Sequence, residues 1–173
     1  MSGPPLIPGL SFSGDWKGID LSFLFQAGLG RDVALTGVYS GGIMDNTQMT
    51  KPFYHGGNSP KYLVENSWRE DNTNAEFPRL SIVQASSNNA YSSTFWYRSG
   101  DYLRLKNLQI GYTFPQKWMS RIGIDRLRIY FEGQNLWTVS ELTKFNIDPE
   151  QPGVSNGYYP QQRIFSFGVN LAF

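Results

Sequence analysis

Hydrophobic and polar residues alternate along five segments of the chain, and the C-terminal segment has the clearest pattern. Between Arg163 and Phe173, every second residue from Phe165 onward is apolar, and the residues between them are mostly small or polar. Because alternate side chains of a β-strand point to opposite faces, this segment is expected to form a strand with one apolar face. A soluble sheet would bury that face in a core, whereas a transmembrane barrel would turn it toward lipid. The alternation alone leaves both alternatives open.

The same pattern predicts an all-β fold with antiparallel strands. Lys17 and Gly18 form a tight link between the first two runs, as in a hairpin, and Pro115 ends the third run because proline cannot donate to the strand ladder. A short helical turn is expected in the connection from Gln116 to Asp125. The five strands are expected at about residues 10–16, 18–28, 101–114, 126–138 and 163–173.

Strand length and aromatic placement favour a transmembrane barrel. Three of the runs have about 10 or 11 residues, the length that a tilted strand needs to cross a bilayer. Trp16, Phe114, Trp137 and Phe173 lie near strand ends, where a barrel carries its interfacial aromatic residues. Five strands are nevertheless too few for a closed barrel, which has about eight or more. Either further strands lie in the long connection, or the chain is part of a larger barrel.

The connections alternate between short and long, as in an up-and-down barrel with short periplasmic turns and long outer loops. The long outer loops are expected at residues 29–100 and 139–162. In the first loop, Ser59 and Pro60 are suited to begin a short helix in "SPKYLVENSW". The segments "VALTGVY" and "STFWYR" are expected to extend the flanking strands beyond the membrane.

Composition narrows the function classes. The formal net charge is +1, which gives no general reason to expect a nucleic-acid partner, and the chain has no cysteine for disulfides or thiolate metal sites. Neither a secretory signal nor an apolar run long enough for a membrane helix is visible. A single histidine, His55, and scattered carboxylates such as Asp45 and Asp71 form no recognisable catalytic or metal-binding motif. We therefore expect no enzyme activity, cofactor or metal.

Several phrases of the sequence, in order, resemble a known family. These are "GLSFSGDWKGIDLSFLFQAGLGRD", "SGDYLRLKNLQIGYTFP", "LRIYFEGQNLWTVSE", "DPE" and "YYPQQRIFSFGVNLAF". Together they resemble the C-terminal end of SusC/RagA-type TonB-dependent outer-membrane transporters, over nearly the whole chain. The resemblance implies an antiparallel transmembrane β-barrel segment, the last five or six strands of a 22-stranded barrel. The family's signal peptide, plug domain and TonB box are absent from this sequence.

The resemblance also implies a function. The chain would supply barrel wall to an outer-membrane importer of oligosaccharides or peptides, working with a SusD-like lipoprotein and with the TonB complex through the missing N-terminal region. Its C-terminal strand would be read by the barrel-assembly machinery, and the expected assembly signal consists of Phe165, Phe167, Val169, Leu171 and Phe173. Loop aromatic residues such as Tyr62 and Trp68 are expected to pack the loops together or to meet a partner, and no substrate-binding residue is assigned.

Two alternatives remain at this stage. One is a small, complete outer-membrane barrel with a structural or adhesive role, and the other is a soluble carbohydrate-binding β-sandwich. The sandwich differs from both barrel hypotheses in what surrounds the apolar face. In either barrel Phe23, Ile129 and Phe167 contact hydrocarbon, whereas in a sandwich they lie between packed layers.

Overall fold

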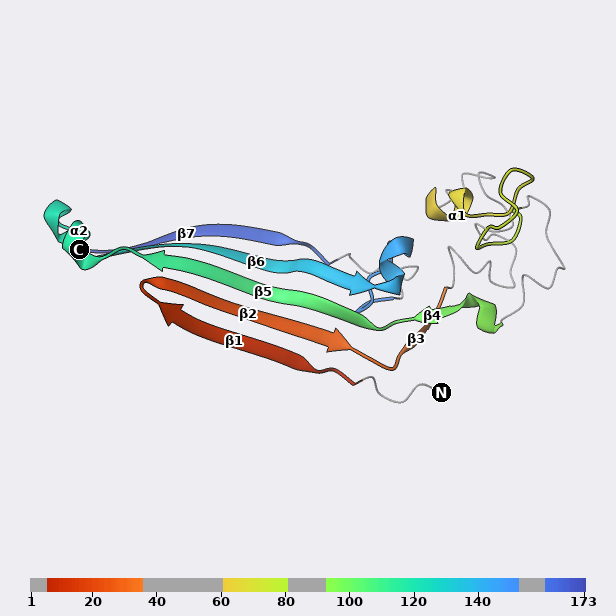
Figure 1. The fold of residues 1–173 in the computed structure, drawn as a ribbon, viewed down its shortest axis with the longest axis horizontal. Helices are drawn as coiled ribbons and strands as arrows, with labels where there is room; N and C mark the ends of the chain where they lie inside the picture. The colour runs from red at the N-terminus through yellow and green to blue at the C-terminus, as the bar shows by residue number, and fades with distance from the viewer. Residues whose placement is uncertain (1–5, 36–60, 81–92, 153–160) are drawn as a thin grey trace.

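The computed structural model describes residues 6–35, 61–80, 93–152 and 161–173. Its main element is a five-stranded antiparallel sheet with the strand order β1-β2-β5-β6-β7, in which the strands lie side by side along the long axis (Figure 1). Each strand pairs with the next strand of this sheet along the chain, which is the up-and-down arrangement. The strands are β1 (Gly9–Trp16), β2 (Ile19–Gly28), β5 (Tyr102–Thr113), β6 (Arg126–Ser140) and β7 (Ile164–Ala172).

Short connections gather at one end of the sheet. Lys17 and Gly18, with φ angles of 49° and 86°, form the two-residue turn between β1 and β2. Positive φ at both positions gives the turn a twist that matches that of the flanking strands, and glycine adopts it without steric cost. The connection from β5 to β6 contains α2 (Gln116–Met119) and the 3-10 helix η3 (Ser120–Ile122). The C-terminus lies at the same end (Figure 1).

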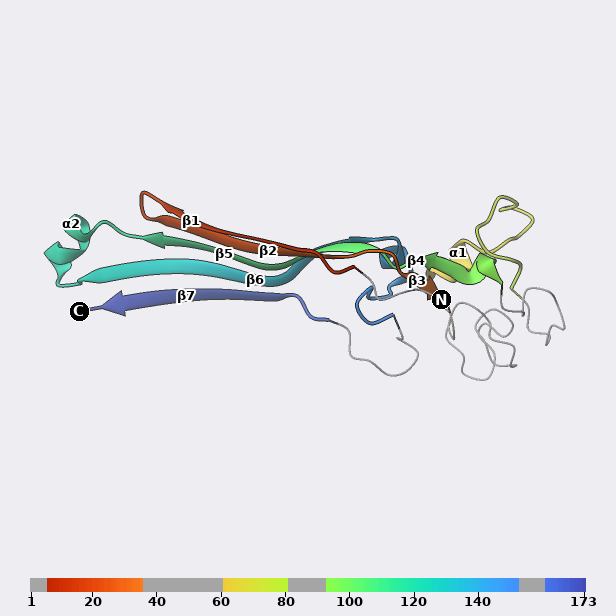
Figure 2. The ribbon, with the colours of Figure 1, turned by 90° about the horizontal axis from the view of Figure 1, so that it is seen from below.

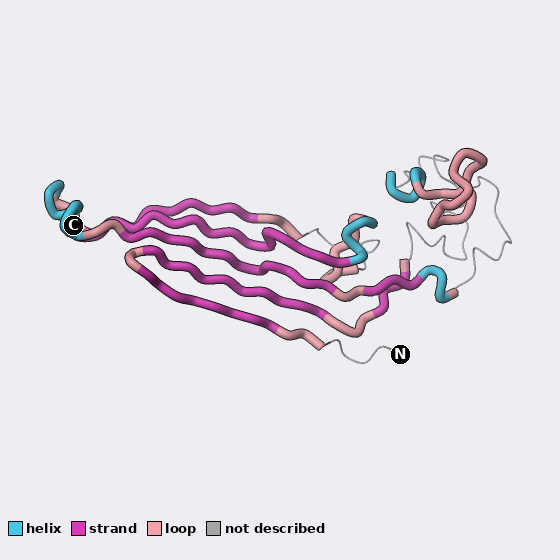
Figure 3. Tube along the Cα trace, viewed as in Figure 1, coloured by secondary structure: helices cyan, strands magenta, loops and turns pink. Residues whose placement is uncertain are grey.

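The long connections gather at the opposite end, beyond the tips of β2 and β5. They contain β3 (Asp32–Ala34), α1 (Lys61–Glu65), η2 (Thr94–Trp96), β4 (Tyr97–Ser99) and η4 (Glu141–Phe145). The helix begins near the position expected from Ser59 and Pro60, although those two residues lie outside the described part of the chain. Figure 3 separates these short helices and loops from the continuous strands of the sheet.

The expected extension of the flanking strands is wrong in part. Residues 32–34 pair with residues 97–99, but as a separate two-stranded sheet, β3-β4. Asp101 accepts a hydrogen bond from the backbone N–H of Gly30 at 2.7 Å, so the chain turns between the two sheets. Within "STFWYR", residues 94–96 form a 3-10 helix, and only the last part of the segment is a strand. Residues 36–39 lie outside the described residues.

Two register shifts interrupt the sheet at the same level. Lys106 has no partner on β2 or β6, and Asn135 and Leu136 of β6 have none on β5. Asn135 has a φ of 52°, as expected where a strand bulges. Beyond the bulges Leu105 pairs with Trp137, so apolar residues remain opposite one another along the whole length of the strands.

The buried hydrophobic residues of the described chain lie outside the five-stranded sheet. One of them, Met119, lies in α2, and the others form a cluster at the end with the long connections. This outer cluster consists of Val33, Leu35, Leu63, Phe77, Trp96, Leu142 and Phe145. Seen from below in Figure 2, the described chain places no second layer of strands against the sheet. None of the described helices is both long and apolar enough to cross a membrane.

Candidate functional site

One face of the sheet is apolar across all five strands. Register places Phe12 of β1 beside Phe23 of β2, with stacked rings whose centroids lie 5.4 Å apart. Near the other edge of the same face, Phe131 of β6 lies beside Phe167 of β7, with ring centroids 5.2 Å apart. We call this surface the apolar face. It includes Leu10, Phe12, Trp16, Ile19, Leu21, Phe23, Phe25, Leu103, Leu105, Leu108, Ile110, Tyr112, Leu127, Ile129, Phe131, Trp137, Val139, Phe165, Phe167, Val169 and Leu171.

The apolar face is uncovered in the described structure. Phe167 is 82% exposed and Ile129 is 44% exposed, while Phe23 is half-buried and contacts the rings of Phe12 and Phe25 on the same face. An apolar surface of this extent is much larger than soluble monomers expose, and it fits a surface in contact with lipid. A β-sandwich would have enclosed these three residues between layers, so the structure gives that alternative no support.

The five residues expected to form the assembly signal lie together at one edge of the sheet. Four of them lie on β7 and Phe173 follows its last residue; among the described residues, β7 pairs with a strand on one side only, β6. Its end is fixed by a hydrogen bond from the Asp125 N–H to the carbonyl of Ala172 at 2.8 Å. The exposed fractions are 62% for Phe165, 82% for Phe167, 59% for Val169, 51% for Leu171 and 85% for Phe173. Their role in assembly remains a prediction.

The opposite face is polar, and it carries a buried arginine where the last long connection folds back onto the sheet. Arg104 of β5 is 3% exposed. Its Nη2 donates to Asp148 Oδ1 at 2.9 Å, and its Nη1 lies 3.1 Å from Glu150 Oε2. The guanidinium Nε donates to Thr138 Oγ1 at 2.9 Å. Arg104 thus joins the five-stranded sheet to the connection after η4.

Lys106 completes this arrangement, which we call the Arg104 cluster (Arg104, Lys106, Asp148 and Glu150). The Lys106 ammonium donates to Glu150 Oε2 at 2.8 Å. The bulge that leaves Lys106 without a strand partner therefore coincides with an ion pair to the loop. Within "DPE", Asp148 also accepts the N–H of Glu150 at 2.9 Å. Sequence reasoning missed the pairing with Arg104, since no pattern links positions that far apart.

A second polar network lies beside the outer cluster. Glu76 accepts hydrogen bonds from the Tyr62 hydroxyl at 2.8 Å and from Arg98 and Lys144 at 3.2 Å each. Partial burial raises the pKa of Glu76, but these three donors outweigh it, so the pKa is lowered from its ordinary value of 4.5. Because Lys144 belongs to η4 and Tyr62 to α1, the network and the outer cluster join the two long connections.

The described residues hold no group of histidine, cysteine, aspartate or glutamate side chains that could bind a metal ion. His55 and Asp45 lie outside the described part of the chain, whereas Asp71 forms an exposed ion pair with Arg69 at 3.3 Å.

No family model matches the chain. TonB-dependent receptor P3 of Formosa agariphila is 28% identical over 95% of this chain, and TonB-dependent receptor SusC of Bacteroides thetaiotaomicron is 30% identical over 59% of it. A solved structure of the RagAB peptide importer in its open-open state matches 99% of this chain at 27% identity, with a TM-score of 0.64. The chain spans 16% and 10% of those receptors and 17% of the RagAB chain.

These matches confirm the resemblance to SusC/RagA-type TonB-dependent receptors. They also confirm the expected fold class, since the antiparallel sheet superposes on a RagAB chain over almost its whole length. The relatives are named as receptors and importers rather than enzymes, in agreement with the expectation that this chain is not an enzyme.

Proposed function

We propose, from its homology to SusC/RagA-type receptors, that this chain is a barrel-wall segment of an outer-membrane nutrient importer. One observation carries the proposal: a sheet that matches a chain of the RagAB peptide importer has an uncovered apolar face across all five strands and a charged opposite face. Lipid would cover the apolar face, and the polar face would line the lumen. Pairing of the edge strands β1 and β7 with further strands would satisfy their backbone groups in the membrane.

The orientation follows from the two ends of the sheet. The turn at Lys17-Gly18 and the α2 connection would face the periplasm, because short turns are periplasmic in such barrels. The outer cluster and the Glu76 network would then lie outside the cell, within outer loops 29–100 and 139–162. There they would form a compact cap that offers a SusD-like lipoprotein a surface to contact.

Transport itself would depend on parts beyond this chain. The TonB complex would supply energy through an N-terminal region, and the barrel-assembly machinery would insert the protein by reading the strand that ends at Phe173. The cargo would be oligosaccharides or peptides. The chain's own contribution is the lipid seal, the polar wall and the attachment of the outer loops.

Deleting the gene and measuring uptake tests this function. The deletion strain is expected to lose uptake of a defined set of labelled oligosaccharides or peptides, and a proton uncoupler should abolish the same uptake in the parent strain. The protein should fractionate with the outer membrane and require detergent for extraction. Recovery of the protein in the soluble fraction would contradict the proposal, as would uptake that neither the deletion nor the uncoupler changes.

A further inference from the structure

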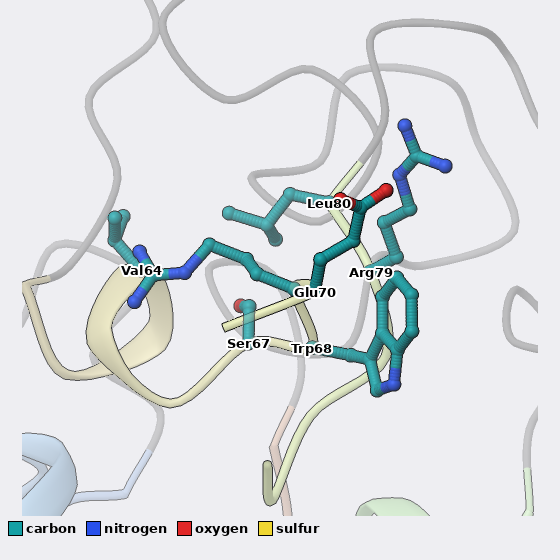
Figure 4. Close-up of a pocket in the computed structure, with 7 residues that line it drawn as sticks. Val64, Ser67, Trp68, Glu70, Arg79 and Leu80 are labelled. Carbon is teal, nitrogen blue, oxygen red and sulfur yellow. The ribbon is translucent and has the colours of Figure 1, made fainter. Parts of the chain in front are cut away.

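A pocket of about 530 Å³ lies in the first long connection, beside the outer cluster. Its lining combines two aliphatic side chains, one indole and three charged groups. Figure 4 shows Val64, from α1, at the left, Leu80 above Ser67 in the middle, and Trp68 and Arg79 at the right. The lining residues are Val64, Ser67, Trp68, Arg69, Glu70, Arg79 and Leu80. The volume falls in the range of about 300–1,000 Å³ typical of small-ligand sites.

The walls of this pocket are held in place by backbone hydrogen bonds and by buried neighbours. The N–H of Trp68 donates to the carbonyl of Phe77 at 2.9 Å, and the N–H of Phe77 donates to the carbonyl of Asn66 at 2.9 Å. Ser67 is 1% exposed, and its hydroxyl donates to the carbonyl of Leu63. Since Leu63 and Phe77 belong to the outer cluster, the pocket is built on the best-packed part of the chain. A pocket formed before its ligand arrives spares the cost of ordering on binding.

Two of the three charged groups that line the pocket are not used by the fold. Arg69 is engaged with Asp71 at 3.3 Å. In the described part of the chain, neither Glu70 nor Arg79 has an ion pair or hydrogen bond, and both are exposed. One free guanidinium and one free carboxylate therefore border the same apolar space. A ligand that carries an anionic group, a cationic group and an apolar group would pair with the guanidinium and the carboxylate and fill the apolar space.

We propose that this pocket binds a short peptide, independently of transport through the barrel. Arg79 would bind the terminal carboxylate, Glu70 would accept hydrogen bonds from the amino group, and an apolar side chain would lie against Val64, Leu80 and the Trp68 indole. A neutral sugar fits less well, because it carries no charge to pair with Glu70 or Arg79, whereas the two ends of a peptide pair with both.

The test is binding of the dipeptide Leu-Leu to the full-length, detergent-solubilised protein, measured by saturation-transfer NMR. Arg79→Gln and Glu70→Gln are each expected to weaken binding by about tenfold, as expected when one hydrogen-bonded charge is lost. Lys61→Gln is the matched control, because Lys61 lies on the neighbouring α1 and its side chain is 85% exposed. Lys61→Gln should bind Leu-Leu like the parent protein.

Three results would overturn the proposal. Equal binding by all four proteins would mean that the dipeptide is bound elsewhere. Equal affinity for acetyl-Leu-Leu-amide, which lacks both terminal charges, would remove the roles of Glu70 and Arg79. Binding of maltotriose but not of Leu-Leu would assign the pocket to glycans. Because binding is measured without transport, any of these results leaves the proposed import function to its own test.

Discussion

Arg128 of β6 binds Asp20 of β2 across the intervening strand β5. Its Nε donates to Asp20 Oδ1 at 2.9 Å, and its Nη2 donates to the other carboxylate oxygen. The bridge passes directly over Gly111, where an added Cβ would lie 2.5 Å from Asp20 Oδ1 and 2.6 Å from Arg128 Nη2. Two strands that do not pair with each other are thus linked on the polar face, and the link depends on the absence of a side chain between them.

Replacing Gly111 by alanine is expected to break this link. The new methyl group must displace Asp20 or Arg128, and overpacking of this kind destabilises by roughly 1–3 kcal/mol. The measurement is the temperature at which the purified protein loses its folded mobility on a gel run without boiling. Gly9→Ala is the control, since its Cβ would approach nothing closer than the carbonyl oxygen of Phe25 at 3.8 Å. Equal melting of the two variants would argue against a tight bridge.

Removing the buried arginine should detach the last long connection from the sheet. Arg104→Met removes the cation of the half-buried Asp148 and one of the two cations of Glu150, and breaking a buried ion pair from one side costs about 3–5 kcal/mol. Amide hydrogen exchange in residues 139–152 should therefore accelerate. Lys106→Met removes a single ion pair from a side chain that is 21% exposed, so its effect should be smaller. Exchange that is as slow in Arg104→Met as in the parent protein would show that the cluster does not hold the loop.

Acid is expected to destabilise the outer cluster and the Glu76 network, because it protonates Glu76. Its pKa is lowered in the folded protein, because hydrogen bonds from Tyr62, Lys144 and Arg98 outweigh the effect of burial. A carboxyl with a lowered folded pKa contributes stability that is fully present above the unfolded value, here 4.5, and is lost as the pH falls through the folded value. Protease cleavage in the segments that form the outer cluster and the Glu76 network should therefore rise below about pH 4.5. Glu76→Gln should reduce this dependence of cleavage on pH. A profile identical in the two proteins would exclude Glu76 as its cause.

The strands were predictable from the sequence because the residues on the apolar face alternate with those on the polar face. Phe131 and Phe167 follow that alternation, and the register places them side by side. The β1-β2 turn was predictable as well, since glycine at position 18 favours the positive φ that a two-residue hairpin needs. At both places the conformation that the local sequence favours is the one that the structure has.

The loop contacts were not predictable, because they join positions without any periodic relation. Arg104 and Asp148 are 44 residues apart, and Lys144 and Glu76 are 68 apart. The sequence marks Trp68 only as a loop aromatic residue, and its place beside a pocket depends on how α1 packs on the outer cluster. The bulge at Lys106, in contrast, leaves a mark in the sequence, because the apolar residues follow a two-residue spacing except between Leu105 and Leu108, where the spacing is three.

The two faces of β7 should respond differently to the same charge. Phe167→Arg places a guanidinium on the apolar face, where lipid contact near the bilayer centre would cost about 2–4 kcal/mol. Ser166→Arg places it on the polar face, where Ser166 pairs with Glu132. The outer-membrane level of Phe167→Arg should fall well below that of Ser166→Arg, as measured by immunoblot of membrane fractions. Equal levels would mean that hydrocarbon does not cover the apolar face.

Deleting Phe173 tests whether this residue is recognised during assembly or stabilises the folded protein. Phe173 follows the last residue of β7 and is 85% exposed, so its loss removes little packing from the folded chain. If its ring is read by the assembly machinery, the deletion should lower the outer-membrane level several-fold, while the fraction that does insert should melt like the parent protein. Trp16→Ala is the matched control, because Trp16 is a 68% exposed aromatic residue at the same end of the sheet but outside the C-terminal strand. An unchanged level after deletion would refute the proposed signal, and equal losses in both variants would assign the effect to interfacial anchoring instead.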